Sequence, residues 1–126
     1  MITYYLESKP RIAEQKLEKA KKLLFEDSPF NSGETIFKLI NSCTNVGSLE
    51  AESLLGMLYL NGIGTKVNEV LAFKHVSNAA NKGFANAQYN LGRMYKYGDG
   101  CDLNFETAIE WFENCLLYTS PSPRDS

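Results

Sequence analysis

Long apolar runs, proline and cysteine are all scarce in this sequence. Its 126 residues include four Pro and three Cys, and 44% of them are hydrophobic. The low proline content excludes collagen-like and proline-rich disordered chains, and no window approaches the roughly 18 apolar residues that a membrane-spanning helix requires. The length and composition therefore predict one globular domain rather than two.

An excess of charge of one sign is also missing. Thirteen Lys and Arg residues against fifteen Asp and Glu leave a net charge of −2. Binding to nucleic acid or to an anionic membrane generally uses a broad positive field, which this composition does not provide. We therefore expect neither nucleic acid nor direct membrane contact among the partners of this segment.

The composition changes abruptly near the C-terminus, where a Ser/Pro tail follows a helical pattern. The stretch from Cys115 to Asp125 looks like the in-frame translation of a transposon mosaic-end sequencing adapter. We therefore expect the natural protein to continue beyond Asn114 with other residues, and we assign no function to 115–126. Residues 1–9 lack the basic and apolar regions of a secretory signal and are expected to form an N-terminal extension.

The dominant pattern is an internal repeat with a period of 36 residues. No single match is informative, but matches in fixed order over a whole period indicate a repeat architecture. Identical residues at this offset include Gly47 and Gly83, Ala51 and Ala87, Leu55 and Leu91, Gly56 and Gly92, Tyr59 and Tyr95, Gly62 and Gly98, Gly64 and Gly100, Asn68 and Asn104, and Ala72 and Ala108.

Each unit has the pattern of two helices joined by a glycine-rich turn. In the first unit, Ala51, Leu55 and Tyr59 recur at the spacing of one helix face. Gly62 and Gly64 follow directly, and glycine tolerates the left-handed backbone with which a helix can end and the chain can reverse. The pattern therefore predicts a helix that ends at this turn.

The second helix of this unit is predicted to begin at Asn68, a good N-cap, and to end before Gly83. Its apolar stripe consists of Ala72, Val76, Ala79 and Ala80. Gly56 and Gly92 lie inside the first helices, where glycine costs about 1 kcal/mol relative to alanine. This repeated cost indicates a close approach of the partner helix, with Ala72 or Ala108 opposite.

A degenerate version of the same unit is predicted over 10–47. It consists of a helix over 10–25 that begins at Pro10, a loop over 25–34 and a helix over 35–46. Lys19 falls where the later units have Leu55 and Leu91. The register of this first helix is therefore left open by one or two residues.

A helix pair of this size cannot bury its own hydrophobic face, and stacking against neighbouring pairs solves the problem. The sequence therefore predicts an all-α fold, a right-handed α/α superhelical solenoid. The predicted segments are the N-terminal extension 1–9, a degenerate repeat over 10–47, a repeat over 48–83, a truncated repeat over 84–114 and the adapter-derived residues 115–126.

These residues resemble the Sel-1-like repeat, a tetratricopeptide-like α/α unit. The motif Ala-x-x-x-Leu-Gly-x-x-Tyr-x-x-Gly-x-Gly begins at Ala51 and again at Ala87, and His75 stands where the next repeat has Trp111. The resemblance implies a non-enzymatic protein-interaction scaffold. The residues with a structural role in the repeat are Leu55, Gly56, Tyr59, Gly62, Gly64, Ala72, Leu91, Gly92, Tyr95, Gly98, Gly100 and Ala108.

Within that family, residues 22–27, 55–59 and 91–95 resemble the first luminal repeats of the adaptor subunit of endoplasmic reticulum Hrd-type ubiquitin ligases. This resemblance implies a scaffold in the degradation of misfolded glycoproteins, located in the endoplasmic reticulum lumen. The alternatives are a cytoplasmic scaffold that regulates a kinase or a cell-wall synthase, and the repeat portion of a larger enzyme.

The expected partners are other proteins, bound on the concave surface that the first helix of each unit lines. By analogy with tetratricopeptide grooves, the residues that face this groove are Glu50, Ser53, Met57, Leu60, Asn86, Tyr89, Arg93 and Lys96. The surface is apolar in one unit and cationic and aromatic in the next, which suits an extended peptide or a helix that carries an acidic group. The alternative is that these residues are merely solvated.

No catalytic site, metal site or cofactor is predicted. His75 is the only histidine, and packing within the repeat explains it better than catalysis or metal binding. Cys43 corresponds to a small buried position, and Cys101 follows the turn Gly98-Asp99-Gly100. That turn follows a helix rather than a strand, so it does not have the context of a phosphate-binding loop.

Overall fold

The computed structural model describes residues 2–26 and 32–119 of the chain. This part of the chain consists of α-helices without any strand, which confirms the all-α prediction. The helices are α1 (Ile2–Glu26), α2 (Gly33–Asn45), α3 (Leu49–Asn61), α4 (Glu69–Asn81), α5 (Ala85–Tyr97) and α6 (Phe105–Thr119).

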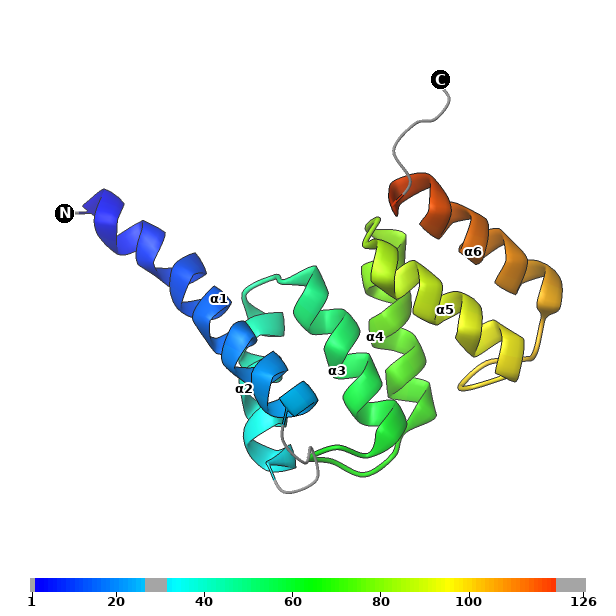
Figure 1. Ribbon diagram of the computed structural model, residues 1–126, viewed down its shortest axis with the longest axis horizontal. Coiled ribbons are helices and arrows are strands. Elements are labelled where there is room, and N and C mark those ends of the chain that lie inside the picture. Colours follow the sequence, from blue (N-terminus) through cyan, green and yellow to red (C-terminus); the bar gives the residue numbers. More distant parts are fainter. Residues whose placement is uncertain (1, 27–31, 120–126) are drawn as a thin grey trace.

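The helices form three successive pairs that stack side by side as a solenoid (Figure 1). Each helix packs against the next one in the chain, and α3 also contacts α5. The first helices of neighbouring pairs therefore lie together, and this contact creates the surface on which the predicted groove residues meet.

Side-chain caps begin three of the helices, and glycine turns at equivalent positions end two of them. The side-chain oxygens of Ser48, Asn68 and Asn104 accept hydrogen bonds from backbone N–H groups three residues on, at 3.0–3.1 Å. Gly62 ends α3 and Gly98 ends α5, with φ angles of 69° and 72° in the left-handed region. The predicted start of α4 after Asn68 is confirmed.

The two helices of a pair approach closely at the predicted glycine positions. A Cβ atom at Gly56 would lie 2.6 Å from Cγ2 of Val76 and 3.0 Å from the carbonyl oxygen of Ala72. A Cβ atom at Gly92 would lie 2.7 Å from the ring of Phe112. The expected close approach to Ala72 and Ala108 is confirmed. The structure adds a contact with a larger side chain one turn further along the partner helix, Val76 or Phe112.

The core consists of two hydrophobic clusters that meet at Tyr59. The first cluster is built from α1, α2 and α3, and the second mainly from α4 and α5. Tyr59 packs against both clusters. Its ring stands edge-on to Phe37 at a centroid distance of 5.6 Å, and Phe73 and Tyr95 repeat this arrangement at 5.5 Å in the next unit.

The first helix differs from the prediction in its length. Helix α1 begins at Ile2, so Pro10 lies inside it and the predicted helix start at Pro10 is wrong. A proline removes one backbone hydrogen bond from a helix, but the turns on either side can continue. Helix α2 begins at Gly33, two residues before the expected position, and residues 27–31 of the expected loop lie outside the described residues.

The 36-residue period continues into α1, so the structure fixes the register of this helix that the sequence left open. Lys16 donates a hydrogen bond to Ser42 across the first pair, and Asn78 donates one to Glu52 at the equivalent place in the second pair. Ala20, the counterpart of Gly56, is fully buried. At the other end, α6 is helical through Thr119, and the rest of the expected adapter-derived segment lies outside the described residues.

Candidate protein-binding groove

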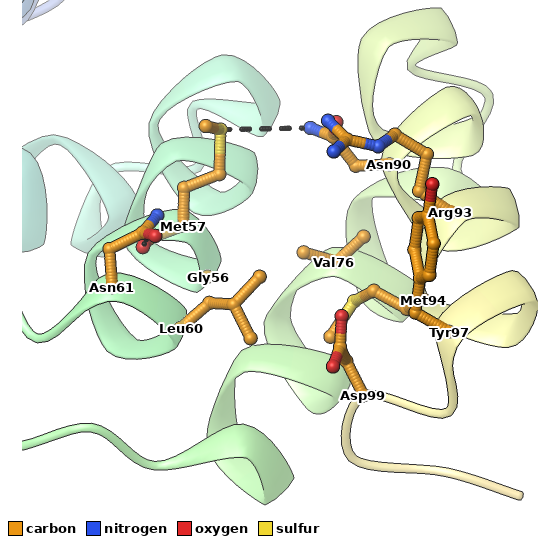
Figure 2. Close-up of a pocket in the computed structure, with 10 residues that line it drawn as sticks. All are labelled: Gly56, Met57, Leu60, Asn61, Val76, Asn90, Arg93, Met94, Tyr97 and Asp99. Carbon is orange, nitrogen blue, oxygen red and sulfur yellow. Dashed lines mark hydrogen bonds between the residues drawn. The ribbon is translucent and has the colours of Figure 1, made fainter.

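Two adjoining hollows lie where α3 and α5 face each other. The first, which we call the Arg93 hollow, has a volume of about 130 Å³. It is lined by Gly56, Met57, Leu60, Asn61, Val76, Asn90, Arg93, Met94, Tyr97 and Asp99 (Figure 2). This volume is below the range of about 300–1,000 Å³ that is typical of small-molecule pockets, and it suits a single inserted side chain.

The Arg93 hollow has an apolar interior and a polar rim. Val76 and Met94 are buried, with 2% of each residue exposed, and Leu60 completes the apolar lining next to the bare backbone of Gly56. Figure 2 shows the side chains of Arg93 and Asn90 on the α5 side of this interior. An aliphatic side chain could enter, while polar groups around it hydrogen-bond to the rim.

Asp99 lies at the same rim, in the turn that follows α5. The rim therefore carries one cationic and one anionic side chain at different places. A ligand that places a carboxylate near Arg93 would need to keep it away from Asp99, because like charges repel.

The second hollow, which we call the Tyr89 hollow, has a volume of about 250 Å³ and also involves α1. It is lined by Lys21, Phe25, Glu50, Ser53, Leu54, Met57, Phe84, Asn86, Tyr89 and Asn90. Met57 and Asn90 line both hollows, and the side-chain amide of Asn90 contacts the Met57 sulfur at 3.7 Å. The two hollows therefore form one groove that this contact divides.

An ion pair fixes the α1 side of the Tyr89 hollow. Nζ of Lys21 lies 2.9 Å from a carboxylate oxygen of Glu50 and 3.2 Å from one of Glu18. The hydrogen bond to Glu50 raises the pKa of Lys21 above its ordinary value, although partial burial acts in the opposite direction. The charge of Glu50 is therefore already compensated within the chain.

Seven of the eight predicted groove residues line these two hollows. Ser53 contributes little surface, because it is only 3% exposed. Lys96 lines neither hollow, and its ammonium group lies 5.3 Å from the centre of the Tyr97 ring. The structure therefore places the predicted residues together, with the exception of Lys96.

Sequence reasoning missed several groove residues. Asn90, Tyr97 and Asp99 come from α5 and its following turn, and Lys21 and Phe25 come from α1. The 36-residue offset provides a signal for the α1 pair, since it aligns Lys21 with Met57 and Phe25 with Asn61. The uncertain register of α1 prevented this alignment from being used.

The side chain of His75 packs against α3 and contacts a carboxylate there. Its ring stacks on the ring of Tyr59 at 5.7 Å with an interplanar angle of 4°, and its Nδ1 lies 3.3 Å from a carboxylate oxygen of Glu52. Asn78 donates a hydrogen bond to the same oxygen. These contacts link α3 to α4, and they agree with the packing role expected for this residue.

The two cysteines of the repeats are held as neutral thiols. Cys43 is 1% exposed and its sulfur donates a hydrogen bond to the carbonyl oxygen of Ala13 at 3.2 Å. Cys101 donates to the carbonyl oxygen of Met94 at 3.5 Å. Burial raises the pKa of both thiols, and near Cys101 the charges of Asp102 and Asp99 raise it further. Thiolate chemistry is therefore disfavoured at both positions.

The Gly98-Asp99-Gly100 segment is a turn between helices. Both glycines have positive φ angles, and a Cβ atom at Gly100 would collide with the carbonyl group of Glu69. Among the described residues, no three His, Cys, Asp or Glu side chains are grouped so that they could hold a metal ion. No helix within 2–26 or 32–119 is long and apolar enough to cross a membrane.

A stack of helix pairs with a 36-residue period and a groove along its first helices defines an α/α repeat solenoid. The Sel1 repeat family matches residues 49–84 and 85–114, which is more than half of the chain. The chain therefore belongs to the Sel1 repeat family. Membership in this family is consistent with a protein-interaction scaffold.

Solved structures of Sel1 repeat proteins share this fold. A Sel1 repeat protein from Oxalobacter formigenes is 28% identical, with 83% of this chain and 80% of that chain covered and a TM-score of 0.74. The protective antigen c5321 of uropathogenic Escherichia coli, which displays an SLR fold, is 25% identical with a TM-score of 0.76. The match covers 91% of this chain but only 25% of that protein.

A third structure, cysteine rich protein B of Helicobacter pylori, shares the fold at 20% identity. Its TM-score is 0.68, with 95% of this chain and 92% of that chain covered. No significant match to a curated protein was found.

Proposed function

We propose that this chain is a non-enzymatic scaffold whose groove binds an extended segment of another protein. The Arg93 hollow is the observation that carries this proposal. It is an apolar slot between two repeats, sized for one side chain and surrounded by polar groups. Such a slot anchors one side chain of a peptide, while the rim residues form hydrogen bonds with the neighbouring backbone.

The preferred ligand carries an acidic residue next to the anchoring side chain. Arg93 is exposed, and among the described residues it has no ion-pair partner, whereas Lys21 is occupied by Glu18 and Glu50. A guanidinium group can form two parallel hydrogen bonds with one carboxylate. The exposed ring of Tyr89 adds apolar contact area on the same helix.

Binding of acidic and charge-neutral versions of one aliphatic peptide library to the full chain tests the proposal. Arg93→Glu should weaken the binding of acidic peptides by about tenfold or more, because it replaces attraction by repulsion. Lys74→Glu changes the charge equally at an exposed position on α4 and should leave affinity within about twofold. Equal affinities for the Arg93→Glu variant and the unmodified chain would contradict the acidic preference.

A narrower proposal is that this scaffold is the adaptor of an endoplasmic reticulum ubiquitin ligase. Its support is the resemblance of residues 22–27, 55–59 and 91–95 to the first luminal repeats of such adaptors. A full-length transcript distinguishes it from a cytoplasmic regulator of a kinase or a cell-wall synthase and from the repeat portion of a larger enzyme. A signal peptide, further repeats and a C-terminal membrane segment would support the adaptor, and an appended kinase or hydrolase domain would contradict it.

A further inference from the structure

A third hollow lies where α1 faces the turn between α2 and α3. We call it the Ser48 hollow, and its volume is about 190 Å³. An apolar cavity of about 150 Å³ is large enough to bind benzene, so this space could hold one phenyl ring. The hollow is lined by Ala13, Glu14, Leu17, Val46, Gly47 and Ser48, none of which lines the two hollows described above.

The 36-residue register makes this hollow the counterpart of a filled place in the next repeat. Glu14 and Leu17 align with Glu50 and Ser53 of the predicted groove face, and Ser48 aligns with Phe84. Phe84 packs half-buried against the second cluster, and it lies with Glu50 and Ser53 at the Tyr89 hollow. The second repeat therefore supplies an aromatic ring at a position where the first repeat has only a hydroxymethyl group.

The backbone is the same at both positions, so the difference lies in the side chain alone. Ser48 has φ and ψ angles of −72° and 119°, and Phe84 has −76° and 114°. The glycines that precede them, Gly47 and Gly83, have φ angles of 94° and 95°. The Ser48 hollow is therefore the space beside a serine that stands where the repeat can hold a phenylalanine.

The wall of the Ser48 hollow is largely apolar. Leu17 belongs to the first cluster and is 7% exposed, whereas Val46 is 60% exposed. The counterpart of Val46 in the next repeat is Lys82, so this apolar wall is particular to the first repeat. A ring placed in the hollow would remove apolar surface from water, which is the main favourable term in most protein association.

Glu14 at this hollow lacks the cation that its counterpart has. Nζ of Lys21 lies 2.9 Å from a carboxylate oxygen of Glu50. Glu14 is exposed and takes part in no ion pair within the described part of the chain. A ligand that places a ring in the hollow would therefore gain from a positive charge beside that ring.

We propose that the Ser48 hollow binds an aromatic side chain of a partner protein that carries Lys or Arg next to it in sequence. The ring takes the place that Phe84 fills in the next repeat, and the cation pairs with Glu14. This proposal rests on the proposed function, because it adds a subsite to the groove. Helices α1 and α5 lie at opposite ends of the row of first helices (Figure 1), so the bound segment carries its basic residue at one end and its acidic residue, near Arg93, at the other.

A short peptide that carries only the aromatic and the basic residue tests the proposal on the full chain. The probe is Ac-Gly-Phe-Lys-Gly-NH2, titrated into the isotope-labelled chain and followed by NMR. The amide signals of Gly47 and Ser48 should shift and saturate. Replacing Phe by Ala, or Lys by Glu, in the peptide should weaken binding by about tenfold or more.

Two variants at Ser48 test whether the empty space is the site. Ser48→Phe fills the hollow from within, as Phe84 does in the next repeat, and should weaken binding of the probe by about tenfold or more. Ser48→Ala loses the same hydrogen bond from the Ala51 N–H group but adds no ring, and it should bind the probe within about twofold of the unmodified chain.

A pair of charge variants tests the role of Glu14. Glu14→Lys should weaken binding of the probe by about tenfold or more, because it replaces attraction by repulsion. Glu110→Lys makes the same change of charge at an exposed position on α6 and should leave the affinity within about twofold. Circular dichroism checks that each variant remains folded.

Four results would overturn the proposal. They are the absence of a saturable shift at Gly47 and Ser48, an unchanged affinity of Ser48→Phe, equal affinities for the Lys and Glu peptides, and a dimer of the unmodified chain in sedimentation that Ser48→Phe dissociates. In the last case a second copy would occupy the hollow. The probe contains no acidic residue, so a failure of acidic peptides to bind near Arg93 would contradict the proposed function without changing these results.

Discussion

Gly56 and Val76 pack so closely that no side chain fits between them. A Cβ atom on Gly56 would lie 2.6 Å from Cγ2 of Val76, and the Ala72 carbonyl oxygen would be 3.0 Å away. Gly92 and Phe112 make the corresponding contact in the next repeat. The short distance between α3 and α4, and between α5 and α6, is therefore possible only because Gly56 and Gly92 have no side chain.

The first prediction concerns this contact. Gly56→Ala should lower the free energy of unfolding by about 1–3 kcal/mol, because overpacking outweighs the gain of about 1 kcal/mol in helix propensity. Urea denaturation measures the change. In a chain that already carries Val76→Ala, the Gly56→Ala substitution should cost less than it does in the unmodified chain, because the clashing methyl group of Val76 is gone. A Gly56→Ala variant as stable as the unmodified chain would contradict this packing.

The second prediction separates turn conformation from contact between repeats. Gly98 and Gly100 have similar φ angles of 72° and 74°. A Cβ at Gly98 would have ordinary contacts at 3.5 Å, whereas one at Gly100 would collide with Glu69. Gly98→Ala should cost about 1–2 kcal/mol from backbone strain alone, and Gly100→Ala should cost clearly more. Equal losses in thermal denaturation would argue against a contact role for Gly100.

The third prediction concerns the ion pair at the edge of the groove. The hydrogen bond to Glu50 raises the pKa of Lys21 above its ordinary value of 10.5. Since the folded-state pKa is the higher one, the stabilisation is fully present below pH 10.5 and is lost as the pH rises through the folded-state value. Lys21→Met should therefore destabilise at pH 8, by no more than about 1 kcal/mol for a partly exposed pair.

Urea midpoints at several pH values check this dependence. The difference between the unmodified chain and Lys21→Met should shrink as the pH rises above 10.5 and through the raised pKa of Lys21. The neighbouring exposed Lys22, replaced by Met, serves as the control and should show a smaller difference at pH 8. A Lys21→Met effect that grows with pH would have the wrong sign for this pair.

The fourth prediction concerns thiol reactivity. Cys43 is almost fully buried, and burial raises its pKa, so alkylation of the native chain at pH 8 should be at least about tenfold slower than in urea. Mass spectrometry after timed exposure to iodoacetamide locates the modified residue. Rapid native labelling of Cys43 would mean that α1 separates readily from α2.

The repeat period made the central helices predictable. The residues that cap α4 and end α3 and α5 recur 36 positions apart, so sequence and structure agree there. The start of α1 did not follow from sequence, since Pro10 is compatible with both a first turn and a helix interior that lacks one hydrogen bond.

The groove was only partly predictable for a geometric reason. Helical spacing identifies residues that share one side of a helix, but a hollow also requires an opposing helix. Leu60 has α5 opposite it and lines the Arg93 hollow. Its counterpart Lys96 lines neither hollow, because α5 begins the last helix pair of the described residues and no further helix lies opposite it there. Asp99 could not be found from helical spacing because it lies in a turn.

The position of Tyr59 between the two clusters affects how the molecule comes apart. Because its ring contacts Phe37 on one side and His75 on the other, loosening either half removes packing from the other half. The two ends are thereby coupled during unfolding, and the chain should melt in a single cooperative transition instead of fraying pair by pair.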